Sequence, residues 1–170
     1  KNFFSKKKNN ISKKVLDVGS GMGIFLYEMK KLKWETYGIE FDKNYTNFCN
    51  KKLKLNITNK NFLNVKPSKK FDLITFNKVL EHIANPRRLL KHATKLLNND
   101  GVVYIEVPDS SVKKKGKFRD ELNPAHLHLF SDQSLGLLAQ QTGLEIKKIQ
   151  RIVDPSGKFT ILSFLKKNKL

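Results

Sequence analysis

Apolar runs of strand length alternate along the chain with stretches in which apolar residues recur every three or four positions. The strand-like runs cover residues 14–19, 34–40, 71–77, 101–107, 145–153 and 158–166, and the helical patterns cover 24–33, 43–52, 86–97 and 131–142. Strands that alternate with helices are typical of a parallel sheet covered by helices on both faces. The pattern therefore predicts a doubly wound α/β domain.

Two of the predicted helices have clear boundary residues. In the segment PRRLLKHATKLLNNDG, Pro86 stands at a first-turn position and the helix ends before Gly101. The apolar residues of this helix share one face: Leu89, Leu90, Ala93, Leu96 and Leu97. Ser131 is the expected N-cap of the last helix, and Gly143 is its expected C′ residue.

The last two strand-like runs are joined by the turn sequence DPSG, with no helical pattern between them. Two such strands predict an antiparallel hairpin at the edge of the sheet. Ahead of them lies a segment of 22 residues, 109–130, with mixed charge and little periodicity. A connection of that length in a compact domain is usually a lid or a binding loop.

The composition fits one compact domain, because 39% of the 170 residues are hydrophobic and 29% are charged. We expect this domain at 13–170, after a basic N-terminal tail at 1–12. The single cysteine, Cys49, excludes a disulfide within the chain and a cysteine zinc cage, and it favours a cytoplasmic location. No apolar stretch reaches the roughly 20 residues that span a bilayer, and the start lacks the apolar core of a secretion signal. Since the chain lacks an initiator methionine, we expect a longer parent protein.

The formal charge of +19 raises the expectation of a polyanionic partner such as nucleic acid. However, only four of the 34 basic residues are arginine: Arg87, Arg88, Arg119 and Arg151. Lysine and asparagine are abundant and alanine is scarce, a pattern that AT-rich codon usage also produces. Surfaces that clamp phosphate usually favour arginine for its two-pronged hydrogen bonding. Codon bias and a functional basic surface therefore stay as alternatives.

The first strand runs into a glycine turn, VLDVGSGMG at 15–23. A dinucleotide fingerprint, G-x-G-x-x-G, would place its third glycine at position 24, where the chain has Ile24. Asp17, inside the strand, is unfavourable beside a pyrophosphate and suits a ligand with an ammonium and a sulfonium. Glu40 ends the second strand, where an acid can accept both hydroxyls of a ribose.

Four segments in this order, VLDVGSGMG, GIEFD, FDLITFNKVLEHIANP and LLNNDGVVYIEVPD, resemble motifs of the class I S-adenosylmethionine-dependent methyltransferases. The match is closest to the small-molecule type with a V-L-E-H segment, and it covers residues 13 to 166. The resemblance implies a Rossmann-like, mostly parallel seven-stranded sheet with an antiparallel C-terminal edge strand. It also implies S-adenosylmethionine as cofactor and S-adenosylhomocysteine as product.

The resemblance assigns cofactor contacts to the turns after the first four strands. Gly19, Gly21 and Gly23 would pass under the methionine part, Asp17 would hold that end, and Glu40 would take the ribose. Asn61 would accept from the adenine amino group, with Phe62 over the ring. The full set of expected cofactor-binding residues is Asp17, Gly19, Ser20, Gly21, Gly23, Glu40, Phe41, Asn61, Phe62, Asn77 and Val79.

Methyl transfer is an in-line displacement, and a general base is needed only when the acceptor must lose a proton. The expected catalytic residues are His126, His128 and His82, the last beside Glu81. Since His126 and His128 alternate with leucines, both imidazoles should face one way in an extended segment. No acid or cysteine is expected to join that pair, so no metal site is predicted. The fourth histidine, His92, is expected at the surface.

The predicted function is methylation of a small-molecule or carrier-linked acceptor, such as a sugar, a quinone or lipid precursor, or another metabolite. If the lysines at 113–115 in the long loop face inward, the acceptor is anionic. One alternative is an RNA (tRNA) methyltransferase, which the charge favours, although no appended RNA-binding module and no N/D-P-P-Y motif is present. A second alternative is a domain that binds the cofactor without catalysis.

Overall fold

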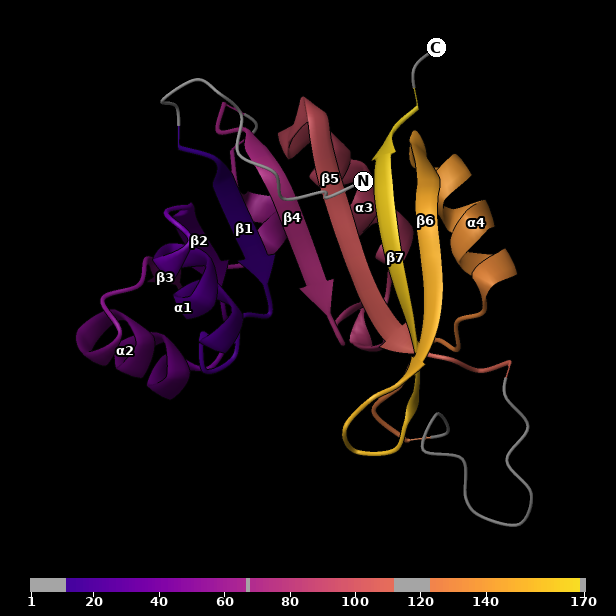
Figure 1. Cartoon of the computed structure of the whole chain (residues 1–170), viewed down its shortest axis with the longest axis horizontal. Coiled ribbons are helices and arrows are strands. Elements are labelled where there is room, and N and C mark those ends of the chain that lie inside the picture. The colour runs from indigo at the N-terminus through magenta and orange to yellow at the C-terminus, as the bar shows by residue number, and fades with distance from the viewer. Residues whose placement is uncertain (1–11, 67, 112–122, 169–170) are drawn as a thin grey trace.

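Seven strands form one sheet in the computed structural model of the chain (Figure 1). The structure describes residues 12–66, 68–111 and 123–168. The strands are β1 (Lys14–Val18), β2 (Glu35–Ile39), β3 (Ile57–Thr58), β4 (Phe71–Asn77), β5 (Leu97–Pro108), β6 (Leu144–Val153) and β7 (Phe159–Lys167). The helices are α1 (Ile24–Lys31), α2 (Lys43–Lys52), α3 (Pro86–Leu96) and α4 (Asp132–Gln140), with 3-10 turns η1 (Phe62–Asn64) and η2 (Leu80–His82).

The strand order across the sheet is β3-β2-β1-β4-β5-β7-β6. All pairs from β3 to β5 are parallel, whereas β7 is antiparallel to both of its neighbours. The doubly wound, mostly parallel seven-stranded sheet and its antiparallel C-terminal hairpin are therefore confirmed. The order also reverses between β1 and β4, so the turns after β1, β2 and β4 meet at one edge of the sheet, which is where ligands bind in open α/β sheets.

The expected antiparallel hairpin forms one edge of the sheet, with the two strands in the reverse of their chain order. β7 lies between β5 and β6, and β6 is the edge strand. The reason is burial, since Ile161, Ser163 and Leu165 of β7 are at most 1% exposed and belong inside a sheet. β6 carries mostly exposed polar side chains, including Lys147 and Lys148, which suit an edge.

Helices cover both faces of the sheet (Figure 1). On one face, α3 and α4 bury Leu90, Leu96 and Leu135 against β4, β5 and β7 in the larger apolar core. On the other face, α1 and α2 bury Leu26 and Cys49 in a smaller core with β1 and β3. No helix within the described residues is long and apolar enough to cross a membrane.

Local capping explains where several helices begin. Asn85 accepts a hydrogen bond from the Arg88 amide at 2.8 Å and caps α3, whose first residue is Pro86 as predicted. The predicted N-cap Ser131 accepts from the Ser134 amide at 3.2 Å and forms a capping box with that residue. These bonds satisfy amides of the first turn, which have no partner inside the helix.

Several boundaries differ from the sequence pattern. β5 begins at Leu97, directly after α3, and not at 101. Leu97 pairs with Phe71 before a register shift, so the strand extends backwards past the polar NND sequence. Gly143 has the expected left-handed backbone, with φ of 74°, but stands beyond Gln141, which caps α4.

The long connection after β5 is only partly described. Asp109 and Phe130 form a single bridge that closes its base. The loop lysines at 113–115 and Arg119 lie outside the described residues, as do residues 1–11 of the expected basic tail. The domain boundaries at 1–12 and 13–170 and the lid role of 109–130 therefore stay predictions.

Candidate functional site

The glycine turn follows β1 at the ligand-binding edge of the sheet. Gly19, Gly21 and Gly23 have positive φ values of 75°, 50° and 73°. A side chain on Gly19 would also meet Val79 Cγ2 at 2.7 Å, so this glycine permits the close approach of the segment after β4. The hydroxyl of Ser20 is buried and has no hydrogen-bond partner among the described residues, an orphan polar group that a bound ligand would satisfy.

Glu40 joins the end of β2 to the glycine turn. Its Oε2 atom accepts a hydrogen bond from the Gly21 amide at 2.8 Å, and its Oε1 atom accepts from the Asp42 amide at 2.9 Å. Asp42 in turn caps α2 by accepting from the amides of Asn44 and Tyr45. The acid that the sequence singled out is therefore held rigidly against the turn.

Asp17 lies beneath the turn and is almost fully buried, with 2% of its surface exposed. Its Oδ1 atom accepts a hydrogen bond from the Thr75 hydroxyl at 2.5 Å and a long one from the Asn77 side-chain Nδ2 at 3.5 Å. Burial raises the pKa of this carboxyl from 3.8 to about 7, the Thr75 hydrogen bond lowers it, and the charge of Glu40 adds to the rise. A nearby cation would favour the charged carboxylate.

The residues after β3 are placed differently from the expectation. The Asn61 side chain caps η1 by accepting from the Leu63 amide at 2.9 Å, so its carbonyl oxygen is already engaged. Phe62 is 2% exposed and packs edge to face against Phe76 and His92 inside the core. The expectation that Phe62 covers an adenine ring disagrees with this placement, because the ring faces the core.

Phe41 offers the aromatic surface that Phe62 lacks. It follows Glu40, is 68% exposed and lies at the same edge of the sheet. The Asn59 side chain donates hydrogen bonds to the backbone carbonyls of Glu40 and Phe41, at 2.8 and 2.5 Å, and fixes this segment. Sequence reasoning missed Asn59; the only signal was an asparagine directly after the short β3.

The segment after β4 turns sharply at Lys78, which has a positive φ of 52°. The Lys78 amide donates to the Glu106 carbonyl at 2.9 Å. Its ammonium group lies 2.5 Å from the Thr160 hydroxyl and within 4 Å of the carboxylates of Glu106 and Asp154. These contacts hold the preceding Asn77 beside Asp17.

Two of the three expected catalytic histidines lie together with Glu81. Glu81, His82 and His126 each offer a donor atom within 4.8 Å of the others, and the two imidazole rings are 4.9 Å apart. The alternation predicted around them is also present, because His126 and His128 are half-buried while Leu127 and Leu129 are 58% and 47% exposed. The expectation that no acid would join the histidines was wrong, because Glu81 comes from a distant turn.

Glu81 also anchors the segment that carries the histidines. Its carbonyl accepts hydrogen bonds from the amides of Leu127 and His128, at 2.7 and 3.2 Å. Its side chain is 1% exposed, and burial raises the pKa of the carboxyl above the ordinary value. Among the described residues, Glu81 Oε2 and His128 Nε2 are buried atoms without a hydrogen-bond partner.

His82 has a defined tautomer. Its Nδ1 atom lies 2.9 Å from the carbonyl oxygen of Ala125, which only accepts, so Nδ1 carries the proton and the neutral ring keeps a lone pair at Nε2.

His92 is not the surface residue that was expected. It is half-buried, its Nε2 atom contacts the Val65 carbonyl at 3.0 Å, and burial lowers its pKa.

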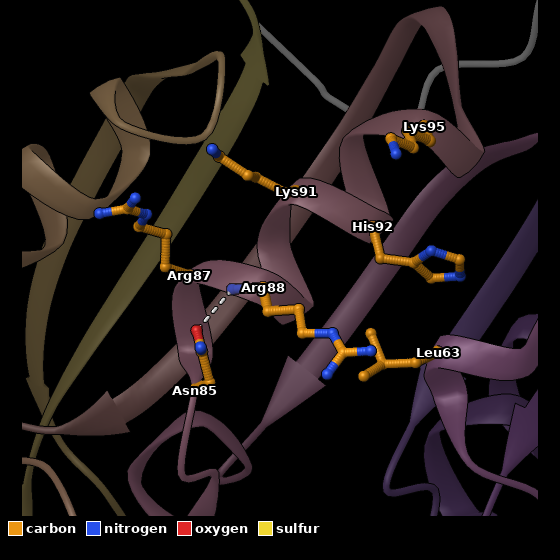
Figure 2. A pocket seen from close by; sticks show the side chains of 7 residues that line it. All are labelled: Leu63, Asn85, Arg87, Arg88, Lys91, His92 and Lys95. Atoms are coloured by element: carbon orange, nitrogen blue, oxygen red, sulfur yellow. Dashed lines mark hydrogen bonds between the residues drawn. The ribbon is translucent and has the colours of Figure 1, made fainter.

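Two cavities lie near these elements. One, of about 350 Å³, has apolar walls and a polar end at Asn77 and Glu106; it is lined by Phe25, Leu73, Thr75, Asn77, Tyr104, Glu106 and Phe164. It adjoins the candidate site because Thr75 and Asn77 both contact Asp17. A larger one, of about 650 Å³, lies over α3 and η1 on the outside of the sheet (Figure 2).

Known proteins match this chain in sequence and in fold. A family model described as a methyltransferase domain matches residues 1–149. The ubiquinone biosynthesis O-methyltransferase of Glaesserella parasuis serovar 5 (strain SH0165) is 31% identical over 127 residues, which are 65% of this chain and 52% of that protein. The mitochondrial enzyme of the same name from Dictyostelium discoideum is 28% identical over 109 residues, 54% of this chain and 34% of that protein. The chain thus spans about half or less of the length of these relatives.

A solved structure shows the same fold at low sequence identity. The 1,6-didemethyltoxoflavin-N1-methyltransferase of Burkholderia thailandensis, solved with bound 1,6-didemethyltoxoflavin and S-adenosylhomocysteine, superposes with a TM-score of 0.76 at 18% identity. The superposition covers 93% of this chain and 72% of that one. The chain therefore belongs to the methyltransferase domain family, and it is a class I S-adenosylmethionine-dependent methyltransferase domain.

Proposed function

We propose that the glycine turn, Glu40 and the end of β4 hold S-adenosylmethionine, and that the domain transfers its methyl group to a small aromatic or quinone-type acceptor. The observation that carries the proposal is the hydrogen bond from the Gly21 amide to Glu40, which unites the turn after β1 and the acid after β2 in one site. The curated relatives are named for O-methylation in ubiquinone biosynthesis, which supports this acceptor class.

The residues present fit each part of that cofactor. Asp17 supplies a buried carboxylate for the ammonium end, beside the backbone at Asn77 and Val79. Glu40, held against the glycine turn, is proposed to accept from the ribose hydroxyls, and the exposed ring of Phe41 is proposed to cover the adenine. The partnerless Ser20 hydroxyl offers a further donor inside the turn. When bound, the cofactor supplies an electrophilic methyl group on a good leaving group.

The chain's own residues then bring the acceptor into line and remove its proton. His82 is the proposed base, since its Nε2 lone pair is free to take a hydroxyl proton while Nδ1 is held by Ala125. Glu81 lies in the same cluster as His82 and His126, where a buried carboxyl stabilises a charged imidazole. His126 and His128 are proposed to border the acceptor.

The other expectations stay predictions. An anionic acceptor depended on loop lysines outside the described residues, and the RNA alternative rests on the net charge of +19. A cytoplasmic location is supported by the buried, unpaired Cys49. A domain that binds the cofactor without turnover is separated from an enzyme by the assay below.

Cofactor binding tests the proposal directly. We expect calorimetry to show that the chain binds S-adenosylhomocysteine and that Glu40→Gln weakens binding about tenfold or more, because one ribose acceptor becomes an amide. The control is Glu28→Gln, whose side chain is exposed on α1 and pairs only with Lys31 among the described residues. An absence of binding by the wild-type chain, or equal binding by all three proteins, would contradict the proposal.

Radiolabelled methyl transfer to a panel of phenols and catechols, with RNA as a second substrate, then identifies the acceptor class.

A further inference from the structure

The outer side of α3 carries a basic cavity that the proposed methyl transfer does not use. It has a volume of about 650 Å³ and lies between α3 and η1 (Figure 2). Its lining is Leu63, Asn85, Arg87, Arg88, Lys91, His92 and Lys95. The cofactor residues after β1, β2 and β4 are absent from this lining, so the cavity is a separate feature of the domain.

All charged side chains that line this cavity are positive. Arg87, Arg88, Lys91 and Lys95 are exposed, and no carboxylate stands among the described residues that line it. A fifth cation approaches one end, because Lys70 donates a hydrogen bond to the Lys95 carbonyl. His92 adds no charge at neutral pH, since burial lowers its pKa. The arginine and lysine side chains, without His92, therefore make the cavity positive.

Some cations elsewhere in the described part of the chain are paired with carboxylates, whereas others, such as Lys51 and Lys52, form no ion pair with a described residue. Arg151 contacts Asp109 and Asp132 at 2.8 and 2.9 Å, and Lys78 lies within 4 Å of two carboxylates. In contrast, none of the four cations in the α3 cavity forms an ion pair with a described residue. The segment 86–97 contains no acidic residue that could reach them. Four unneutralised cations on one helix repel each other, and an anion relieves that repulsion.

Codon bias does not account for the arginines. A bias toward AT-rich codons enriches lysine and asparagine, and the chain accordingly has only four arginines. Two of these four, Arg87 and Arg88, are adjacent at the start of α3 and both line the cavity. Arginine offers the planar, two-pronged donor geometry that matches a phosphate.

The spacing of the cations along α3 indicates the length of the anionic group that they could bind. Arg88, Lys91 and Lys95 follow one another at intervals of three and four residues, so they are spread along α3 over about 10 Å. Figure 2 shows Arg88 reaching toward Leu63, whereas Arg87 and Lys91 point to the opposite side. Because the charges fan out along the helix, they match several phosphates in a row better than a single anion.

We propose that the cavity over α3 binds an oligophosphate group, that is, the diphosphate or triphosphate of a small molecule. The N-terminal end of α3 adds a favourable dipole at Arg87 and Arg88. The site is independent of the proposed cofactor site and of the methyl acceptor.

Inorganic tripolyphosphate is the probe, because it has no adenosine with which to occupy the cofactor site. Calorimetric titration is carried out on the intact chain in 0.15 M salt, with S-adenosylhomocysteine present in excess. We expect one site, and we expect the double variant Arg87→Gln/Arg88→Gln to lose about tenfold or more in affinity, since each lost charge-assisted bond is substantial. The matched control Lys51→Gln/Lys52→Gln removes the same charge from the exposed end of α2 and keeps wild-type affinity.

Circular dichroism and the affinity for S-adenosylhomocysteine show that the double variant is folded. If it is not folded, Lys91→Gln/Lys95→Gln replaces it with the same expectation. Equal loss in the α2 control means attraction by net charge alone and overturns the proposal. So does an absence of tripolyphosphate binding, including the case in which only RNA or vesicles with anionic lipid bind.

Discussion

At the scale of single residues, Asp17 has the most unusual environment of the site. A carboxyl with 2% exposure is hydrogen-bonded to Thr75 and Asn77, and its pKa rises from 3.8 to about 7. Such a group costs stability when it is charged and becomes useful when a cation arrives. This placement agrees with a cofactor that has an ammonium end.

Asp17 makes stability depend on pH. Between its unfolded pKa of 3.8 and its folded pKa of about 7, the folded protein holds a proton that the unfolded chain has lost. The free energy of unfolding therefore falls as pH rises from 4 to 7, by at most about 4 kcal/mol. Urea unfolding at several pH values should show that Asp17→Asn flattens this slope. Asp100→Asn, at an exposed position of β5, should keep it; equal slopes in wild type and Asp17→Asn would refute the assignment.

His82 is the residue on which the proposed chemistry depends. With Nδ1 donating to Ala125, only Nε2 can take a proton, and glutamine cannot do so. We expect His82→Gln to lower kcat about a hundredfold or more on an acceptor found by the methyl-transfer panel, with unchanged affinity for S-adenosylhomocysteine. His92→Gln, in the cavity over α3, should keep kcat. A His82→Gln enzyme with normal kcat would exclude His82 as the base.

At the scale of elements, two glycines have opposite roles. Gly19 has a φ of 75° and an added Cβ would lie 2.7 Å from Val79, whereas Gly136 lies within α4 with nothing inside 4 Å of such an atom. We expect Gly136→Ala to raise the free energy of unfolding by about 0.5–1 kcal/mol. Gly19→Ala should lower it by more than about 1 kcal/mol and abolish cofactor binding. Urea denaturation measures both, and a neutral Gly19→Ala would show that the turn tolerates a side chain.

At the scale of the whole molecule, Arg151 connects three segments that are distant in sequence. From β6 it contacts Asp109 at the base of the long connection and Asp132 at the start of α4, at 2.8 and 2.9 Å. The Asp109 side chain is fully buried, so it depends on this partner and on the Ser111 amide. The sheet edge, the long connection and the last helix are thereby stabilised together.

Removal of Arg151 should therefore destabilise the fold. We expect Arg151→Met to lower the free energy of unfolding by about 2 kcal/mol, because a buried carboxylate loses its charged partner. Lys147→Met removes an exposed partner of Glu145 on the same strand and should change stability by less than about 0.5 kcal/mol. Chemical denaturation at neutral pH compares the two, and equal effects would show that Asp109 does not depend on Arg151.

The sequence by itself determined the alternation of strands and helices, the glycine turn, the first-turn position of Pro86 and the cap at Ser131, because these features depend on neighbours within one or two turns of the chain. The tertiary structure decided that β7 lies inside the sheet, that Phe62 faces the core and that Glu81 meets His126. Each of those outcomes depends on residues far apart in sequence, whose competition for burial and hydrogen bonds no local pattern records. The resemblance to a known family supplied the cofactor, but only the fold showed that Phe41, and not Phe62, is the exposed ring beside Glu40.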